Sequence, residues 1–158
     1  MNQITLPAHT ALVAHDTVGP DALREFFDHY YPLLHEFTES VGVLPQAARA
    51  YYFSPPGEAF DIAAGFVIAD EDLDLIAPLI DDIGDGHVSL KRFEEIQAVA
   101  KRVTCAYSDL GAQWDEFAAA TEADGHAVDR LLIEEYVTMG DDQDAPVTDL
   151  FIPLTRPQ

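Results

Sequence analysis

The sequence predicts an α+β fold made of a duplicated βαββ unit, with a mostly antiparallel sheet and two main helices packed along it. The first observation behind this is that the order strand, helix, strand, strand occurs across Ile4–Ile68 and again across Glu95–Leu154. The second is a match between segments of the two halves: "PAHTALVAH" with "EIQAVAKRV", and "RAYYFSPPG" with "IEEYVTMGD". Strands and helices in this order are typical of an antiparallel sheet with helices packed on it.

The first repeat begins with a loosely alternating strand from about Ile4 to His15. A helix then starts at Pro20 and Asp21, because apolar residues recur at helical spacing from there to Gly42, which ends it. Pro32 lies inside this helix and should kink or break it. Two strands follow, "RAYYFSPPG" with its Pro-Pro-Gly turn and "AFDIAAGFVIA".

An acidic connector at about 69–87 separates the repeats, and we expect one short helical turn in it, at "LIAPLI". The second repeat, at about 88–154, contains the strands "HVSLKRF" and "EIQAVAKRVTCAY". A helix with Ser108 as N-cap and Gly125 as its stop follows. The strands "RLLIEEYVTM" and "PVTDLFIPL" close the chain. We expect residues 1–158 to form a single domain, with the first repeat at about 4–68.

Composition restricts the partners. The chain has 29 acidic and 8 basic residues, a formal net charge of −21, and 48% hydrophobic residues. Such a surface repels phosphate backbones and anionic lipid headgroups, so we expect neither nucleic-acid nor membrane binding. It tolerates cations, whether metal ions or organic ones. A single cysteine excludes an internal disulfide, and no secretory signal or apolar span is present, so we expect a cytoplasmic protein.

Metal and cofactor chemistry find no support in the sequence. The six histidines show neither HxxxH nor HExxH spacing. Asp70, Asp72 and Asp74 resemble the start of a calcium loop, but Leu75 stands where such a loop needs glycine. Cys105 has no histidine near it in sequence, and GxSxG, GxGxxG and Walker motifs are absent. We therefore expect no metal and no cofactor.

The strand "LLIEEYVTMG" places two glutamates in a segment of strand-preferring residues. Side chains alternate along a strand, so Glu134 shares a face with Tyr136 and Glu135 with Ile133 and Val137. If both faces are covered, at least one carboxylate lies where water is scarce, which costs several kcal/mol without a partner. The face that carries Glu135 is the more apolar of the two.

Aromatic residues recur near equivalent places in the two repeats, so that Tyr52 corresponds to Tyr136 and Ala50 to Glu134. One interpretation is a pocket in which ring faces and a carboxylate attract an organic cation. The other is ordinary core packing, with a tyrosine hydroxyl paired to the glutamate. The candidate ligand-binding residues are Glu134, Tyr136, Tyr52, Phe66, Tyr107 and Trp114.

Taken together, these motifs resemble the gyrase-inhibitor-like (GyrI-like), or effector-binding, domain of bacterial transcription regulators. "ARAYYFSPPGEAFDIAAGFVI" is similar to the tyrosine strand and the Phe-Asp…Gly strand of that family, and "EEYVTMGDDQDAPVTDLFIPL" to its Glu-x-Tyr strand, polar turn and Pro-Leu strand. The resemblance implies a pocket for hydrophobic, often cationic, small molecules, with Glu134 as its carboxylate. Cys105 departs from the family pattern, which has glycine there.

The leading hypothesis is a stand-alone small-molecule-binding protein that senses or sequesters hydrophobic ligands, including cationic drugs. No helix-turn-helix precedes the domain, so we do not expect the chain itself to contact DNA. Two alternatives stay open. In one, the protein is a hydrolase of reactive small molecules with Glu134 as general acid or base. In the other, it is an acidic protein-interaction module such as a gyrase inhibitor. A glutamate beside a tyrosine suits both binding and catalysis, so the sequence does not separate these two hypotheses.

Overall fold

The computed structural model describes residues 2–53, 60–82, 86–106, 109–125, 132–138 and 145–154. Within this part of the chain the strands form one eight-stranded sheet, in the order β1-β6-β8-β7-β3-β4-β2-β5, and all neighbours are antiparallel. The strands are β1 (Asn2–Leu6), β2 (His9–Val18), β3 (Ala47–Tyr52), β4 (Phe60–Ile68), β5 (Val88–Phe93), β6 (Ile96–Thr104), β7 (Leu132–Thr138) and β8 (Val147–Pro153). The helices are α1 (Leu23–Ser40), α2 (Leu73–Ile76) and α3 (Leu110–Ala123), with 3-10 turns η1 (Pro20–Ala22), η2 (Asp70–Asp72) and η3 (Ala77–Asp82).

The duplicated βαββ unit is confirmed. The first copy is β2-α1-β3-β4 and the second is β6-α3-β7-β8. The sheet order reads alike from both edges, so that the two copies meet where β3 pairs with β7. At this junction Ala50 pairs with Glu134, the residue that the sequence comparison makes its equivalent. Equivalent residues that face each other across an antiparallel pair lie on a local twofold axis. The pseudo-twofold axis of the fold therefore passes through this pair.

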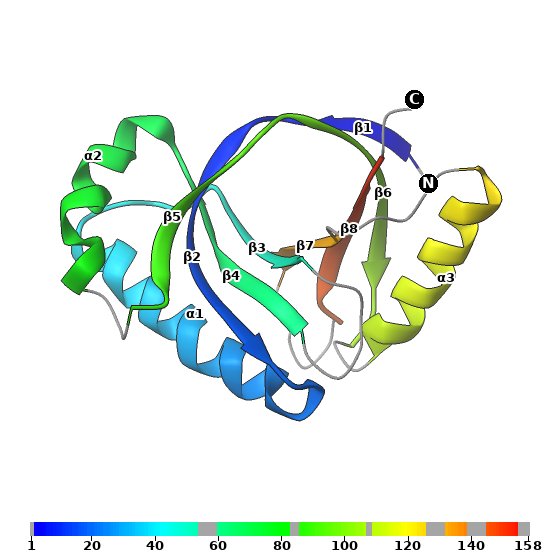
Figure 1. The fold of residues 1–158 in the computed structure, drawn as a ribbon, viewed down its shortest axis with the longest axis horizontal. Helices are drawn as coiled ribbons and strands as arrows, with labels where there is room; N and C mark the ends of the chain where they lie inside the picture. Colours follow the sequence, from blue (N-terminus) through cyan, green and yellow to red (C-terminus); the bar gives the residue numbers. More distant parts are fainter. Residues whose placement is uncertain are drawn as a thin grey trace.

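The sheet is strongly curled, and different elements cover its two faces (Figure 1). The main helices α1 and α3 lie against the outer face, one on each half of the sheet. Helix α1 buries the side chains of Phe26, Tyr30, Leu34 and Thr38, which recur every fourth residue and so share one side of the helix. The ribbon formed by β1–β2 and β5–β6 arches over the other face, where a separate cluster around Tyr51 and Phe93 is packed.

Two local expectations about the first repeat change in the structure. The single strand expected from about Ile4 to His15 is divided at Pro7 into β1 and β2, because proline cannot donate to the ladder. Helix α1 runs through Pro32 without a break. Pro32 and Asp28, whose carbonyl loses its helical partner, are both exposed, so the lost hydrogen bond falls on the side where water can replace it.

The acidic connector contains more helix than expected. Instead of one turn it forms η2, α2 and η3 in succession, and Ile76 is fully buried in the cluster under α1. Leu73 and Ile80 pack against the same cluster, so three apolar side chains hold this acidic segment to the core. Helix α3 has Asp109, without a side-chain capping bond, at the N-cap position that the sequence assigned to Ser108. Ser108 itself and the Pro-Pro-Gly turn after β3 lie outside the described residues.

Gly65 on β4 is required by the close approach of β2. A Cβ atom there would stand 1.9 Å from the backbone oxygen of Leu12 and 2.8 Å from the Cα of Val13. Because these are backbone atoms within the sheet, they cannot move aside cheaply. We expect Gly65→Ala to lower the free energy of unfolding by about 3 kcal/mol or more, measured by urea denaturation.

Gly111 provides the matched control for this substitution. It lies in the first turn of α3, and a Cβ atom would meet nothing within 4 Å. Gly111→Ala should therefore raise the free energy of unfolding, by up to about 1 kcal/mol, because alanine restricts the unfolded chain and favours helix. Equal effects of the two substitutions would contradict the close packing of β4 on β2.

Candidate functional site

The carboxylate of Glu134 is buried on the helix-covered face of the sheet, where only 3% of the residue is exposed. Three uncharged groups donate hydrogen bonds to it. The hydroxyls of Tyr52 and Tyr136 donate to Oε1 over 3.1 and 2.7 Å, and the indole Nε1 of Trp114 donates to Oε2 over 2.7 Å. Both carboxylate oxygens thus have a partner. These four residues form what we call the Glu134 cluster.

Strand alternation, strand pairing and helix packing together position the residues of the Glu134 cluster. Glu134 and Tyr136 are two residues apart on β7 and share a face by strand alternation. Tyr52 reaches the same face from the neighbouring strand β3, and Trp114 arrives from the first turns of α3 above the sheet. Tyr52 and Trp114 are 82 and 20 positions away from Glu134 in the sequence. Their contacts with it therefore depend on both strand register and helix packing.

A second aromatic group, from α1, lies beside the cluster. The ring of Tyr31 is 5.9 Å from that of Tyr136, edge-on, and 5.9 Å from that of Phe66. The ring of Phe27, one turn earlier, is 6.5 Å from that of Tyr136. The Tyr31 hydroxyl donates to the Arg49 carbonyl over 2.7 Å, which ties α1 to β3. Sequence reasoning missed Tyr31; its i, i+4 relation to Phe27 on one helix face was the available signal.

Burial governs the protonation of the Glu134 cluster. Removal from water raises the pKa of the Glu134 carboxyl, while the hydrogen bonds from Trp114, Tyr136 and Tyr52 oppose that shift. Burial, reinforced by the negative charge of Glu134, also raises the pKa of Tyr52 and Tyr136, so both hydroxyls keep their protons and act as donors. No lysine, arginine or histidine of the described residues pairs with this carboxylate. The described residues that hold it are all neutral donors.

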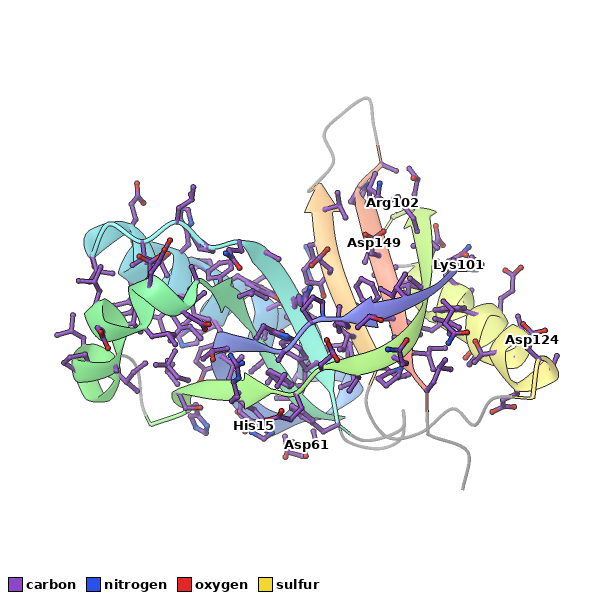
Figure 2. All side chains as sticks on the ribbon, turned by 90° about the horizontal axis from the view of Figure 1, so that it is seen from above. His15, Asp61, Lys101, Arg102, Asp124 and Asp149 are labelled. Carbon is purple, nitrogen blue, oxygen red and sulfur yellow. The ribbon has the colours of Figure 1, made fainter. Side chains whose placement is uncertain are left out.

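Glu135, the next residue, lies on the opposite face and has a cationic partner. Its Oε1 accepts from the Nε of Arg49 over 2.9 Å, and the two side chains are 22% and 12% exposed. Its cross-strand neighbour Asp149 likewise binds Arg102, through two hydrogen bonds of 2.8 and 3.0 Å (Figure 2). Glu135 and Asp149 are therefore each compensated by an arginine.

The sequence makes the face of β7 that carries Glu135 the more apolar one, but Glu135 is less buried than Glu134. Ile133, two residues before Glu135, is buried, whereas Val137, two residues after it, is 41% exposed at a point where the pairing of β7 with β8 shifts register. β7 is a central strand of the sheet, yet it is open to solvent at Val137, near its end. Glu134, on the less apolar face, is covered by helix α3 and by its own aromatic neighbours.

The remaining candidate residues have different placements. Phe66 is buried in the cluster under α1 and approaches the site through Tyr31. Tyr107 lies outside the described residues. Cys105 is partly exposed, and burial together with the negative charges of Asp109 and Glu134 raises the pKa of its thiol. It is thus a poor nucleophile.

Other features of the described chain do not coincide with the Glu134 cluster. An open hollow of about 290 Å³ lies at one end of the sheet, lined by residues that include His9, Gln46, Asp70 and Glu71. No group of three or more histidine, cysteine, aspartate or glutamate side chains in the described ranges could hold a metal ion. None of the helices described here is long and apolar enough to cross a membrane.

No protein-family model matches the sequence, and no curated protein matches it. Solved structures do. The C-terminal domain of EcmrR is similar with a TM-score of 0.78 at 13% identity, over 99% of this chain and 97% of that domain. In the EcmrR–DNA complex the chain spans 57% of the EcmrR chain.

Two further similar structures each have a TM-score of 0.64 over 98% of this chain. One is SAV2435 bound to tetraphenylphosphonium, at 8% identity and 93% of that chain. The other is a hydrolase encoded by lin2189 from Listeria innocua, at 15% identity and 91% of that chain. The chain has the gyrase-inhibitor-like fold, which confirms the fold that the resemblance in sequence implied.

The raised pKa of Glu134 predicts a pH-dependent stability difference from Glu134→Gln. A carboxyl whose folded pKa lies above its ordinary value of 4.5 stabilises the fold fully below that value, and loses this contribution as pH rises through the folded pKa. The free energy of unfolding of the wild type should therefore fall relative to that of the variant as pH rises, by about 1.4 kcal/mol per unit of pKa shift. Urea denaturation at several pH values measures this, and a constant difference would contradict the shift.

Proposed function

We propose that the protein binds hydrophobic organic cations at the Glu134 cluster. The observation that carries this is a carboxylate with 3% exposure that three neutral donors hold and that no described cation compensates. Burying an uncompensated carboxylate is costly, whereas a cationic guest supplies the missing charge. The neighbouring Glu135, which has Arg49, needs no such guest.

The aromatic residues suit such a guest. The three donors, Tyr52, Tyr136 and Trp114, are partly exposed. The hydroxyls of the two tyrosines are nevertheless hydrogen-bonded to the buried carboxylate. A guest enters by turning one or more of these rings aside, and it then exchanges their hydrogen bonds for a charge interaction at low solvation. The faces of the displaced rings add cation–π attraction.

Similarity in fold supports the same proposal. SAV2435 holds tetraphenylphosphonium, a cation whose charge is enclosed by four phenyl rings. The packing alternative predicted hydroxyl contacts to the glutamate, and those contacts are present, so hydrogen bonding alone does not separate packing from binding. The missing countercharge is what favours binding. In a cytoplasmic setting, such binding serves to sense a hydrophobic drug as an effector or to sequester it.

A hydrolase is the second candidate, favoured by the raised pKa of Glu134 and by the likeness to the Listeria innocua hydrolase. A glutamate that keeps its proton closer to neutral pH is suited to general acid or base catalysis with a water molecule. The tyrosine hydroxyls beside it would then orient the reacting group.

Tetraphenylphosphonium tests the binding proposal directly. We expect it to raise the melting temperature of the wild type, and Glu134→Gln to weaken its affinity by about tenfold or more. Affinity should fall as pH is lowered through the raised pKa of Glu134, because protonation removes the charge that attracts the cation. Triphenylphosphine oxide, which is neutral, should show no such pH dependence. Calorimetry measures both compounds.

Glu135→Gln is the matched control, because it removes a carboxylate one residue away on the other face. It should lower stability through the loss of charge opposite Arg49, yet leave the affinity for tetraphenylphosphonium unchanged. If the two variants weaken binding equally, or if the wild type does not bind, the binding proposal is wrong.

Turnover of electrophilic small molecules distinguishes the second candidate. For a hydrolase, Glu134→Gln should abolish product formation and leave the affinity for a neutral substrate within a few-fold of the wild type. If the wild type binds such compounds and releases them unchanged, catalysis is excluded for them.

A further inference from the structure

Thr148 on β8 carries a buried hydroxyl without a hydrogen-bond partner among the described residues. The residue is 1% exposed, and its Oγ1 is the buried side-chain atom that stands unsatisfied there. A hydroxyl withdrawn from water with no partner destabilises the folded state, and valine would fill the same space without that cost.

Other buried threonines of the described chain do not share this feature. Thr38, also 1% exposed, donates to the His35 carbonyl over 3.0 Å, and Thr121 donates to the Phe117 carbonyl over 2.8 Å. Thr10 accepts from Arg92 over 3.2 Å. The orphan hydroxyl of Thr148 is thus a local property of its place in the sheet.

That place is beside the Glu134 cluster. Thr148 pairs across the strands with Tyr136, and Leu150, two residues on, pairs with Glu134. The side chain of Thr148 therefore points to the helix-covered face that carries Glu134. On its other side Thr148 pairs with Val103, which packs with α3. Diagonal neighbours of this kind are about 7–8 Å apart, roughly the span of one phenyl ring with a substituent.

We propose that the Thr148 hydroxyl is a second polar contact for the guest of the Glu134 cluster. This rests on the proposed function and specifies its ligand class: a hydrophobic cation with one neutral hydrogen-bonding group, such as an alcohol or a carbonyl, about one ring away from the charge. The cationic centre lies at Glu134, and the neutral group satisfies the orphan hydroxyl, which can donate or accept. Thr148 is thereby a specificity-determining residue, since a guest without such a group leaves the hydroxyl unpaired.

Two triphenylphosphonium cations of equal size test this. One carries a 4-(hydroxymethyl)phenyl group. The other carries a 4-ethylphenyl group, in which a methyl group replaces the hydroxyl. Binding of both is measured by calorimetry to the wild type and to Thr148→Val, which keeps the shape and removes the hydroxyl. We expect the preference for the hydroxymethyl compound to be on the order of tenfold greater in the wild type than in the variant. Thr148→Ser, which restores a hydroxyl, should recover the preference.

Thermal unfolding without ligand gives an independent readout. Thr148→Val should melt at the same temperature as the wild type or higher, because an unpaired hydroxyl is removed. Thr38→Val is the control, because its hydroxyl is paired, and it should not raise the melting temperature.

The outcomes separate the two levels of the proposal. If both cations bind and Thr148→Val retains the wild-type preference, the subsite is wrong while cation binding at Glu134 stands. If neither cation binds the wild type, both are wrong. A lower melting temperature for Thr148→Val would also overturn the subsite, because it would show that the hydroxyl already has a partner.

Discussion

A buried carboxylate without a cationic partner among the described residues lies where the two repeats meet. Glu134 is buried under helix α3 and two tyrosines, with hydrogen bonds to both oxygens but no cation among the described residues. Hydrogen bonds from neutral donors distribute the charge without neutralising it. The carboxyl therefore either keeps its proton more readily or needs a cation to balance its charge. The chemistry proposed for this fold, whether binding or catalysis, follows from that balance.

The duplication explains why the site has a single carboxylate. Ala50 and Glu134 face each other on the pseudo-twofold axis, so an exact repeat would place two glutamates in direct cross-strand contact. Two negative charges at such a distance, in a place without water, would repel strongly. Alanine at position 50 avoids this repulsion. The tyrosines two residues further on, Tyr52 and Tyr136, keep the symmetry and donate to the same oxygen.

The sheet also separates two kinds of acidic group. On the face under the arching ribbon, Glu135 and Asp149 have arginine partners, and Arg49, the partner of Glu135, also lies 3.2 Å from the Nε2 of His9. On the helix-covered face Glu134 has no cationic partner among the described residues. One strand thus carries a structural carboxylate and a poorly compensated one at adjacent positions, and they differ only in the direction in which each side chain points.

The sequence by itself determined the order of elements, the two repeats, and the strand that holds Glu134 and Tyr136 on one face, because periodicity and turn residues are local properties of the chain. It also pointed to Tyr52 and Trp114, although the role of the whole set stays a prediction. It predicted one helical turn of the connector but not the others, and it missed the uninterrupted helix at Pro32 and the place of Tyr31. Only the tertiary structure decided that Tyr52 and Trp114 meet the same carboxylate, that Arg49 compensates Glu135, and that the Thr148 hydroxyl lacks a partner among the described residues. Those facts depend on strand register and on the seating of α3, which bring distant residues within hydrogen-bond reach and which no local pattern encodes.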